Sequence, residues 1–362
     1  MKLSIHKGTF KESAYELLSY GDMRVIAFKY STGVEALRIE NKKGHIVILP
    51  FQGQQIWNIH FGGRDLTMNT TIKEPVPTTE YLKTYGGFLY HCGATAMGVP
   101  QADDNHEKHG ELPNIEYKSA QIVCDEDEKG KYISVEGELD YDIAFVVKYS
   151  FRPKCRIYEN SGVLKVSVDL ENMKHSPMEY MYLCHINFCQ IPGAKLHYNV
   201  PRDKAHIKMI DNIPQTVTGK VREDLRKYMD EIYEDYTIVD RVGKDFEAYD
   251  PEVTFVLTYK PDSDNRGYTL QYEEGKGACY VNHPLDTLPV GVRWISKTPD
   301  ESSMGMVLPA TAEHLGYNNA KRLGQIKVLA PRETVSFYIE TGYLEEADAK
   351  AMIEKIDGIL EK

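Results

Sequence analysis

Regular alternation of apolar and polar residues restricts the folds open to this 362-residue chain more than any other feature. In residues 163–170 (VLKVSVDL), apolar side chains at 164, 166, 168 and 170 alternate with Lys165, Ser167 and Asp169. A period of two residues predicts an antiparallel strand with one buried face. The same reasoning predicts strands at residues 44–49, 132–139, 143–151, 253–259, 268–272 and 334–340.

Turn-forming sequences such as 260–267 (KPDSDNRG) separate these strands. Helical spacing of apolar residues predicts surface helices at 220–236 and at about 345–360, and we expect a short early helix at 10–19. Many short strands with few helices predict an all-β fold, either a large antiparallel sandwich or a barrel. No repeat, linker or shift in composition divides the sequence, so we expect one domain over residues 1–362.

The composition excludes several classes of function. A net charge of -11 without a basic stripe argues against nucleic-acid binding. The sequence has no signal-peptide core and no apolar run of about 20 residues, so we expect no membrane segment. The six cysteines are scattered without a CxxC pair, as in reduced cytoplasmic proteins. No dinucleotide, Walker or nucleophile-elbow motif occurs.

A long loop over residues 81–117 is the first candidate for chemistry, because it is rich in glycine, histidine and tyrosine. Loops of this length without secondary structure are usually functional or disordered. Within it, the segment 108–114 (KHGELPN) makes His109 the leading candidate. The competing interpretation is a solvated surface histidine.

An apolar strand at residues 180–188 carries the second candidate. Alternation places His185 and Asn187 on one face with Met181 and Leu183. Polar groups on an apolar face need partners or line a cavity. The competing interpretation is a hydrogen-bonded core histidine.

A third candidate segment, residues 304–317, runs from an apolar strand into a loop with Glu313 and His314. An ordinary exposed carboxylate would fit Glu313 equally well. His283, Arg293 and Trp294 are further candidates for contacts with hydroxyl groups and a ring face, although a tryptophan is more often part of a core.

A metal site is an alternative at the same loop, since His106, His109 and Glu111 lie close in sequence. Zinc and manganese sites use such ligands. The His-x2-His-x-Glu spacing is not a strong metal signature, so we expect no metal.

In order, these segments resemble the galactose mutarotase-like superfamily, in particular its branch of aldose 1-epimerase-related bacterial proteins of poorly defined substrate. The resemblance runs through nearly the whole chain. It lies in residues 49–56 (LPFQGQQI), 62–66 (GGRDL), 86–93 (GGFLYHCG), 109–114 (HGELPN), 185–188 (HINF), 308–311 (LPAT) and 328–334 (VLAPRET).

The resemblance implies an antiparallel supersandwich, a sugar substrate and no cofactor. It implies that His185 is a general acid and that His109 binds substrate. The general base of the superfamily is a glutamate before the proline of the C-terminal motif, but Leu308 takes that position here. Glu313 is the nearest substitute carboxylate. The candidate substrate-binding residues are Gln55, Trp57, Asn187, His283, Arg293 and Trp294.

We therefore expect a cytoplasmic aldose 1-epimerase-like isomerase that interconverts the anomers of a free or modified aldose. Two alternatives stay open, a non-catalytic sugar-binding protein and a metal-dependent carbohydrate isomerase, epimerase or lyase that also uses His185. We expect a small sugar as the partner, no nucleic acid and no membrane, and we leave a homodimer open.

Overall fold

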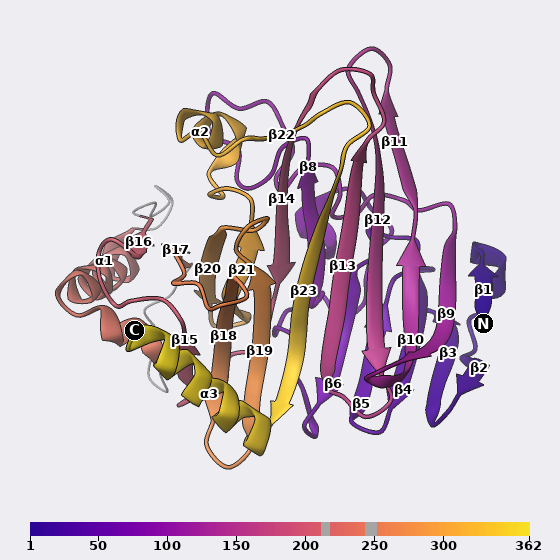
Figure 1. Ribbon diagram of the computed structural model, residues 1–362, viewed down its shortest axis with the longest axis horizontal. Coiled ribbons are helices and arrows are strands. Elements are labelled where there is room, and N and C mark those ends of the chain that lie inside the picture. The colour runs from indigo at the N-terminus through magenta and orange to yellow at the C-terminus, as the bar shows by residue number, and fades with distance from the viewer. Residues whose placement is uncertain (211–217, 243–251) are drawn as a thin grey trace.

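Two large antiparallel sheets form the molecule (Figure 1). The computed structural model describes residues 1–210, 218–242 and 252–362, and within these ranges the sheets have ten and thirteen strands. Every strand pairing is antiparallel, and the large all-β sandwich predicted from the alternation is confirmed.

The ten-stranded sheet has the order β1 (Lys2–Ile5), β9 (Ala120–Asp127), β10 (Gly130–Gly137), β12 (Val147–Tyr158), β13 (Val163–Asn172), β23 (Thr334–Glu345), β19 (Gly277–Pro284), β18 (Arg266–Glu273) and β15 (Lys195–Tyr198), with β11 (Leu139–Ile143) on β12. The thirteen-stranded sheet has the order β16 (Ile207–Met209), β17 (Val253–Leu257), β20 (Val290–Lys297), β21 (Ser302–Ala310), β14 (Met178–Ile186), β8 (Leu89–Ala94), β6 (Ile56–Phe61), β5 (Gly44–Ile48), β4 (Glu35–Asn41), β3 (Met23–Lys29) and β2 (Tyr15–Tyr20), with β7 (Arg64–Asp65) on β6 and β22 (Lys327–Leu329) on β14.

The core between the sheets follows from the alternation. Along β13 every second residue, from Leu164 to Leu170, is buried, and the residues between them are only partly buried. Tyr182 of β14 and Phe337 of β23 stack across the two sheets, with ring centroids 4.5 Å apart. Each buried Val, Leu or Ile in such a core contributes roughly 1.5–3 kcal/mol to stability.

Helices are few and lie outside the sheets. α3 (Glu346–Leu360) packs Ala349, Ile356 and Ile359 against the outer face of the ten-stranded sheet and crosses it diagonally in Figure 1. α1 (Gly219–Glu234) and α3 lie where the sequence predicted helices. The remaining helical segments among the described residues are α2 (Gly316–Arg322) and the 3-10 turns η1 (Lys7–Thr9), η2 (Tyr81–Thr84) and η3 (Tyr236–Asp240).

The early helix predicted at residues 10–19 is wrong, because that segment runs into the edge strand β2. A bulge between Glu16 and Leu18 shifts the register of β2 against β3. The bulge breaks the strict period of two, and a short apolar run then fits a helix as well as a strand.

β14 separates two environments. Its residues Tyr182, Cys184 and Ile186 face the core between the sheets, whereas Met181 and Leu183 belong to a second apolar cluster. This second cluster lies on the side of the thirteen-stranded sheet that faces away from the ten-stranded sheet.

In the described part of the chain, none of the helices combines the length and apolar character that membrane crossing needs.

The buried His283 of β19 should make stability depend on pH. Burial lowers the pKa of this histidine to about 3, so the unfolded chain binds one more proton than the folded chain between pH 6.5 and 3. The stability that this difference provides is complete above pH 6.5 and is lost as the pH falls. Between pH 6.5 and 5, we expect the free energy of unfolding of His283→Leu to fall by roughly 2 kcal/mol less than that of the wild type.

Urea unfolding at the two pH values measures this difference. His175→Leu, at an exposed position, is the matched control and should keep the wild-type pH dependence. Equal pH dependence in the His283 variant and the wild type would contradict the expectation.

Candidate active site

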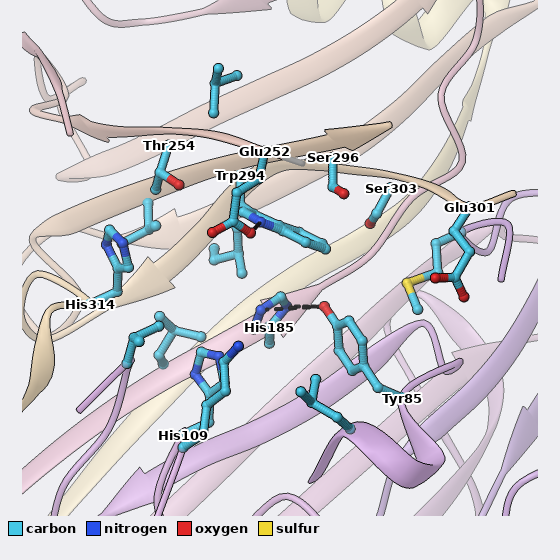
Figure 2. Close-up of a pocket in the computed structure, with 18 of the residues that line it drawn as sticks. Tyr85, His109, His185, Glu252, Thr254, Trp294, Ser296, Glu301, Ser303 and His314 are labelled. Carbon is cyan, nitrogen blue, oxygen red and sulfur yellow. Dashed lines mark hydrogen bonds between the residues drawn. The ribbon is translucent and has the colours of Figure 1, made fainter. Parts of the chain in front are cut away.

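A cavity of about 450 Å³ lies against the second face of β14 (Figure 2). Its walls come from distant parts of the chain: the segment 68–70, the region of η2, the loop 99–109, strands β14, β17, β20 and β21, and His314 before α2. A volume of this size suits a small-molecule ligand. Two of the predicted catalytic residues, His109 and His185, line it.

His185 lies on β14 beside Leu183, as the alternation predicted, and both side chains line the cavity. His185 is 5% exposed, and its Nδ1 lies 2.8 Å from Oδ1 of Asn187. Burial is the main reason that the pKa of His185 is lowered to about 3, and nearby Lys108 lowers it further. The imidazole is therefore neutral at physiological pH.

Asn187 fixes which nitrogen of His185 carries the proton. Its Nδ2 donates to the carbonyl of Gly87 at 3.1 Å, so its Oδ1 must be the atom that faces His185. A carbonyl oxygen only accepts, so Nδ1 of His185 is the protonated nitrogen and Nε2 carries the lone pair. The Tyr85 hydroxyl also donates to Oδ1 of Asn187, at 3.0 Å.

His109 meets His185 at nearly a right angle, with ring centroids 5.0 Å apart. Its backbone has a φ of 64°, which few residues other than glycine adopt. Two hydrogen bonds hold that conformation, from the amide of His109 to the Gly98 carbonyl and from the amide of Gly93 to the His109 carbonyl. The following Gly110 has no room for a side chain, because a Cβ would lie 2.1 Å from the Ala96 carbonyl.

His109 is 6% exposed, and its Nδ1 has no hydrogen-bond partner among the described residues. Burial, followed by the nearby His185 and Lys108, holds the pKa of His109 well below its usual value. Both imidazoles are therefore neutral. The surface histidine considered as an alternative does not describe this residue.

Aromatic rings surround the histidine pair. Trp294 lies 5.6 Å from His185 and Tyr85 lies 5.6 Å from the same ring, centroid to centroid. Tyr81 packs at 4.9 Å from His109. Burial raises the pKa of Tyr81 and Tyr85 well above the usual value, so both hydroxyls stay protonated. Such rings can stack on the apolar face of a sugar.

The cavity also contains charged residues that sequence reasoning did not select. Glu252 accepts a hydrogen bond from Nε1 of Trp294 at 2.5 Å, and Glu301 accepts from Thr70 and Thr71. Both carboxylates line the cavity, together with Lys108. Glu301 sits in the turn between β20 and β21, where the sequence resembles an ordinary solvated hairpin turn.

Glu313 does not line the cavity. Its carboxylate pairs with Nζ of Lys208 at 2.8 and 3.0 Å, while the next residue, His314, does line it. Leu308, at the position where the superfamily has its catalytic glutamate, also lines the cavity. The role of Glu313 as a base stays a prediction, and its geometry does not add support.

Two predicted substrate-binding residues support the site from behind. Gln55 is fully buried and donates to the Pro113 carbonyl and to Oδ1 of Asn114, so it holds the end of the His109 loop. Trp57 packs under Gly86 and Gly87, where an added Cβ would lie 3.1 Å from its ring. Neither side chain lines the cavity.

Arg293 and His283 lie in the interior, away from the cavity. Alternation along β20 turns Trp294 toward the cavity and Arg293 to the opposite side, where its guanidinium lies 4.0 Å from the Tyr198 ring centroid. Both nitrogens of His283 are buried without a partner in the described structure, and its ring packs against Tyr259. These residues do not come together with the histidine pair.

The residues of the metal alternative are dispersed. The Glu111 carboxylate accepts from Thr95 and from the Tyr149 hydroxyl, and it does not line the cavity with His109. His106 bonds to a backbone carbonyl through Nδ1. Within residues 1–210, 218–242 and 252–362, no group of three His, Cys, Asp or Glu side chains is arranged to hold a metal ion.

Several solved structures are similar to this chain in fold. The chain is similar to a protein described as a "putative aldose 1-epimerase" from Klebsiella pneumoniae, with a TM-score of 0.79, 16% identity and coverage of 99% of this chain and 92% of that one. It is similar to a galactose mutarotase-like protein from Clostridium acetobutylicum, with a TM-score of 0.60, 13% identity and coverage of 90% and 99%. A GalM/aldose epimerase homologue from C. elegans has a TM-score of 0.52, 14% identity and coverage of 84% and 97%.

At these identities the likeness concerns the fold, and it confirms the galactose mutarotase-like architecture predicted from the motifs. Among curated proteins, none matches the sequence significantly. A family model described as a domain of unknown function, DUF4432, matches residues 31–212, half of the chain. The chain therefore belongs to the DUF4432 family.

Proposed function

We propose that the protein is an aldose 1-epimerase-like isomerase, which interconverts the anomers of an aldose by opening and closing its ring. The observation that carries the proposal is the pair of neutral, nearly perpendicular imidazoles of His185 and His109 in one cavity. The likeness in fold to the aldose 1-epimerase-related structures supports it. Aromatic rings around the pair provide surfaces for a pyranose.

In this proposal His185 begins as a base. Its Nδ1–H is held by Asn187, and the Tyr85 hydroxyl, 3.5 Å from Nε2, makes its shorter bond to Asn187 at 3.0 Å, so the lone pair of Nε2 can take the proton from the anomeric hydroxyl, O1. A lowered pKa keeps Nε2 unprotonated and ready at neutral pH. Negative charge then develops on the ring oxygen, O5, as the C1–O5 bond breaks and the C1=O1 bond forms.

His109 stabilises that charge. In this scheme the neutral His109 carries its proton on Nε2, since Nδ1 is the nitrogen that is buried without a partner among the described residues. It donates a hydrogen bond from Nε2 to O5 without losing that proton, which is the use of a neutral histidine as an electrophile. The protonated His185 then gives its proton to O5, which is bonded to the same carbon as O1. Rotation about C1–C2 and the reverse steps close the ring as the other anomer.

His185 thus acts first as a base and then as an acid, which retains the acid role that the resemblance implies. The scheme needs no carboxylate base, and this fits the leucine at position 308. Trp294 offers a ring face to the sugar, and its hydrogen bond to Glu252 fixes the orientation of the indole.

Removal of the base is the direct test. We expect His185→Ala to lower the rate of anomer exchange by roughly 10²- to 10⁴-fold, the usual contribution of a general base. Glu313→Gln should change it by less than about tenfold, because Glu313 does not line the cavity. Exchange is measured by NMR or polarimetry across common aldoses, with and without a chelator.

A loss of about 100-fold in Glu313→Gln would instead identify Glu313 as the base. Exchange that His185→Ala leaves intact would contradict the mechanism. Aldose binding without accelerated exchange in the wild type would identify a sugar-binding protein, and loss of exchange on chelation would favour the metal-dependent alternative.

The pH dependence tests the role of Asn187. For the wild type, kcat/KM should stay constant from about pH 8 down to about pH 5, because His185, with a pKa of about 3, keeps its lone pair there. Asn187→Asp places a carboxylate next to Nδ1 and raises the pKa of His185. Protonation of His185 then removes the base at a higher pH, so the acid limb of the kcat/KM profile should move up by at least about one pH unit.

Asn160→Asp, at an exposed position outside the cavity, is the matched control and should keep the wild-type profile. A wild-type acid limb near pH 6.5, or identical profiles for the wild type and Asn187→Asp, would count against the assignment.

A further inference from the structure

The end of the cavity away from the three histidines contains a second set of polar groups. Figure 2 shows His109, His185 and His314 on one side and Glu301 and Ser303 on the other. All five residues line the same cavity. The mechanism proposed above uses only the histidine side.

The Glu301 carboxylate is held through one oxygen. Its Oε1 accepts three hydrogen bonds, from the Thr70 hydroxyl at 2.9 Å and from the amide and hydroxyl of Thr71 at 3.0 and 3.1 Å. These donors, led by the Thr71 amide, lower the pKa of Glu301, so the carboxylate is ionised. The other oxygen, Oε2, accepts nothing from the residues that the structure describes, and it is available to a ligand.

Backbone pairing fixes the position of this carboxylate. The amides and carbonyls of Asn69 and Ser302 exchange two hydrogen bonds of 2.9 Å, which join the β20–β21 hairpin to the segment before η2. A further bond, from the Thr298 amide to the Glu301 carbonyl, closes the turn. Glu301 is therefore presented by a rigid turn, although it lies outside both strands.

Ser303 supplies a second unused group. The residue is 2% exposed, and Oγ has no hydrogen-bond partner in the described ranges of the chain. A buried hydroxyl without a partner costs free energy. A ligand hydroxyl in the cavity would satisfy it.

We propose that Glu301 and Ser303 form a hydroxyl-binding subsite that selects uncharged aldoses and rejects acidic sugars. This inference rests on the proposed function, since it names the substrate class of the same cavity. Oε2 of Glu301 accepts from a sugar hydroxyl, and an ionised acceptor makes a stronger hydrogen bond than a neutral one. A carboxylate or phosphate on the sugar would meet a fixed negative charge and would bring no proton to donate.

The charge of the cavity agrees with this assignment. Two carboxylates, Glu252 and Glu301, and one ammonium group, Lys108, are its charged lining residues in the described structure. Lys108 precedes His109 in the sequence and perturbs the pKa values of His109, His185 and His314. Among the lining residues the single positive charge thus acts on the histidine side of the cavity, whereas Lys73, which acts on Glu301, does not line the cavity.

Glu301→Gln in the full-length protein tests the subsite. The glutamine oxygen can take the place of Oε1 toward Thr70 and Thr71, which leaves an NH₂ group where Oε2 was. A hydrogen-bond acceptor becomes a donor, so the preference should invert. The probes are D-glucose, D-galactose and D-glucuronate, with binding measured by saturation-transfer NMR and anomer exchange measured separately.

We expect the wild type to bind at least one neutral probe about tenfold or more tightly than glucuronate. In Glu301→Gln, binding of that neutral probe should weaken by about tenfold while glucuronate binding strengthens. Glu136→Gln, on β10 of the other sheet, makes the same charge change outside the cavity and should keep the wild-type preference.

Ser303→Ala is a second variant in case Glu301→Gln does not fold. It should weaken binding of the neutral probe by about threefold to tenfold and leave the thermal midpoint no lower, because the removed hydroxyl has no partner. Equal or tighter wild-type binding of glucuronate, or an unchanged preference in Glu301→Gln, would overturn the proposal.

The two proposals fail differently. Selective binding of a neutral aldose that depends on Glu301, without anomer exchange, would keep the subsite and refute the isomerase. Anomer exchange with a substrate preference that does not depend on Glu301 would support the isomerase and refute the subsite. If none of the three probes binds, the proposed subsite is refuted for these aldoses.

Discussion

The hydrogen bond between Nδ1 of His185 and Oδ1 of Asn187 is the interaction on which the site depends. It leaves the lone pair on Nε2, and this decides what the histidine can do. The bond is held on both sides, by the Gly87 carbonyl behind Asn187 and by the core that fixes β14. The chemistry of the cavity is therefore a consequence of how one strand is packed.

That packing has a cost that the fold offsets. A neutral buried histidine must give up its solvation, and the lowered pKa of His185 reflects this loss. The opposite face of β14 contributes Tyr182, Cys184 and Ile186 to the core between the sheets. Because these apolar contacts hold the strand in place, the other face of β14 can keep His185 buried and neutral beside Asn187.

The alternation made most of the fold predictable from the sequence, because a strand with one buried face has a period that few other structures share. It also placed His185 on the face of Leu183, where the structure has it. It failed at the edge strand β2, where a bulge interrupts the period. The C-terminal helix could be predicted because its apolar face meets the outer face of a sheet.

The site was harder to predict, because a sequence shows which residues are present and not which of their atoms already have partners. Gln55 and Arg293 have the chemistry of sugar ligands, yet Gln55 donates to the Pro113 carbonyl and to Asn114, and Arg293 points away from the cavity, where its Nε donates to the Met306 carbonyl. Glu301 carries no sequence signal, since its carboxylate is positioned by Thr70 and Thr71, 231 and 230 residues away. Ser303 carries none either, because a sequence does not show that its hydroxyl is buried without a partner in the described structure.

The joining of the β20–β21 hairpin to the segment at Asn69 has a consequence for how the protein reaches its working form. The cavity cannot form until segments from the first quarter and the last fifth of the chain have met, and closing such long loops is slow. An isolated segment of the chain therefore cannot form the cavity. A ligand that fits the cavity would bind only the completed fold, and it would act as a stabiliser of the whole molecule.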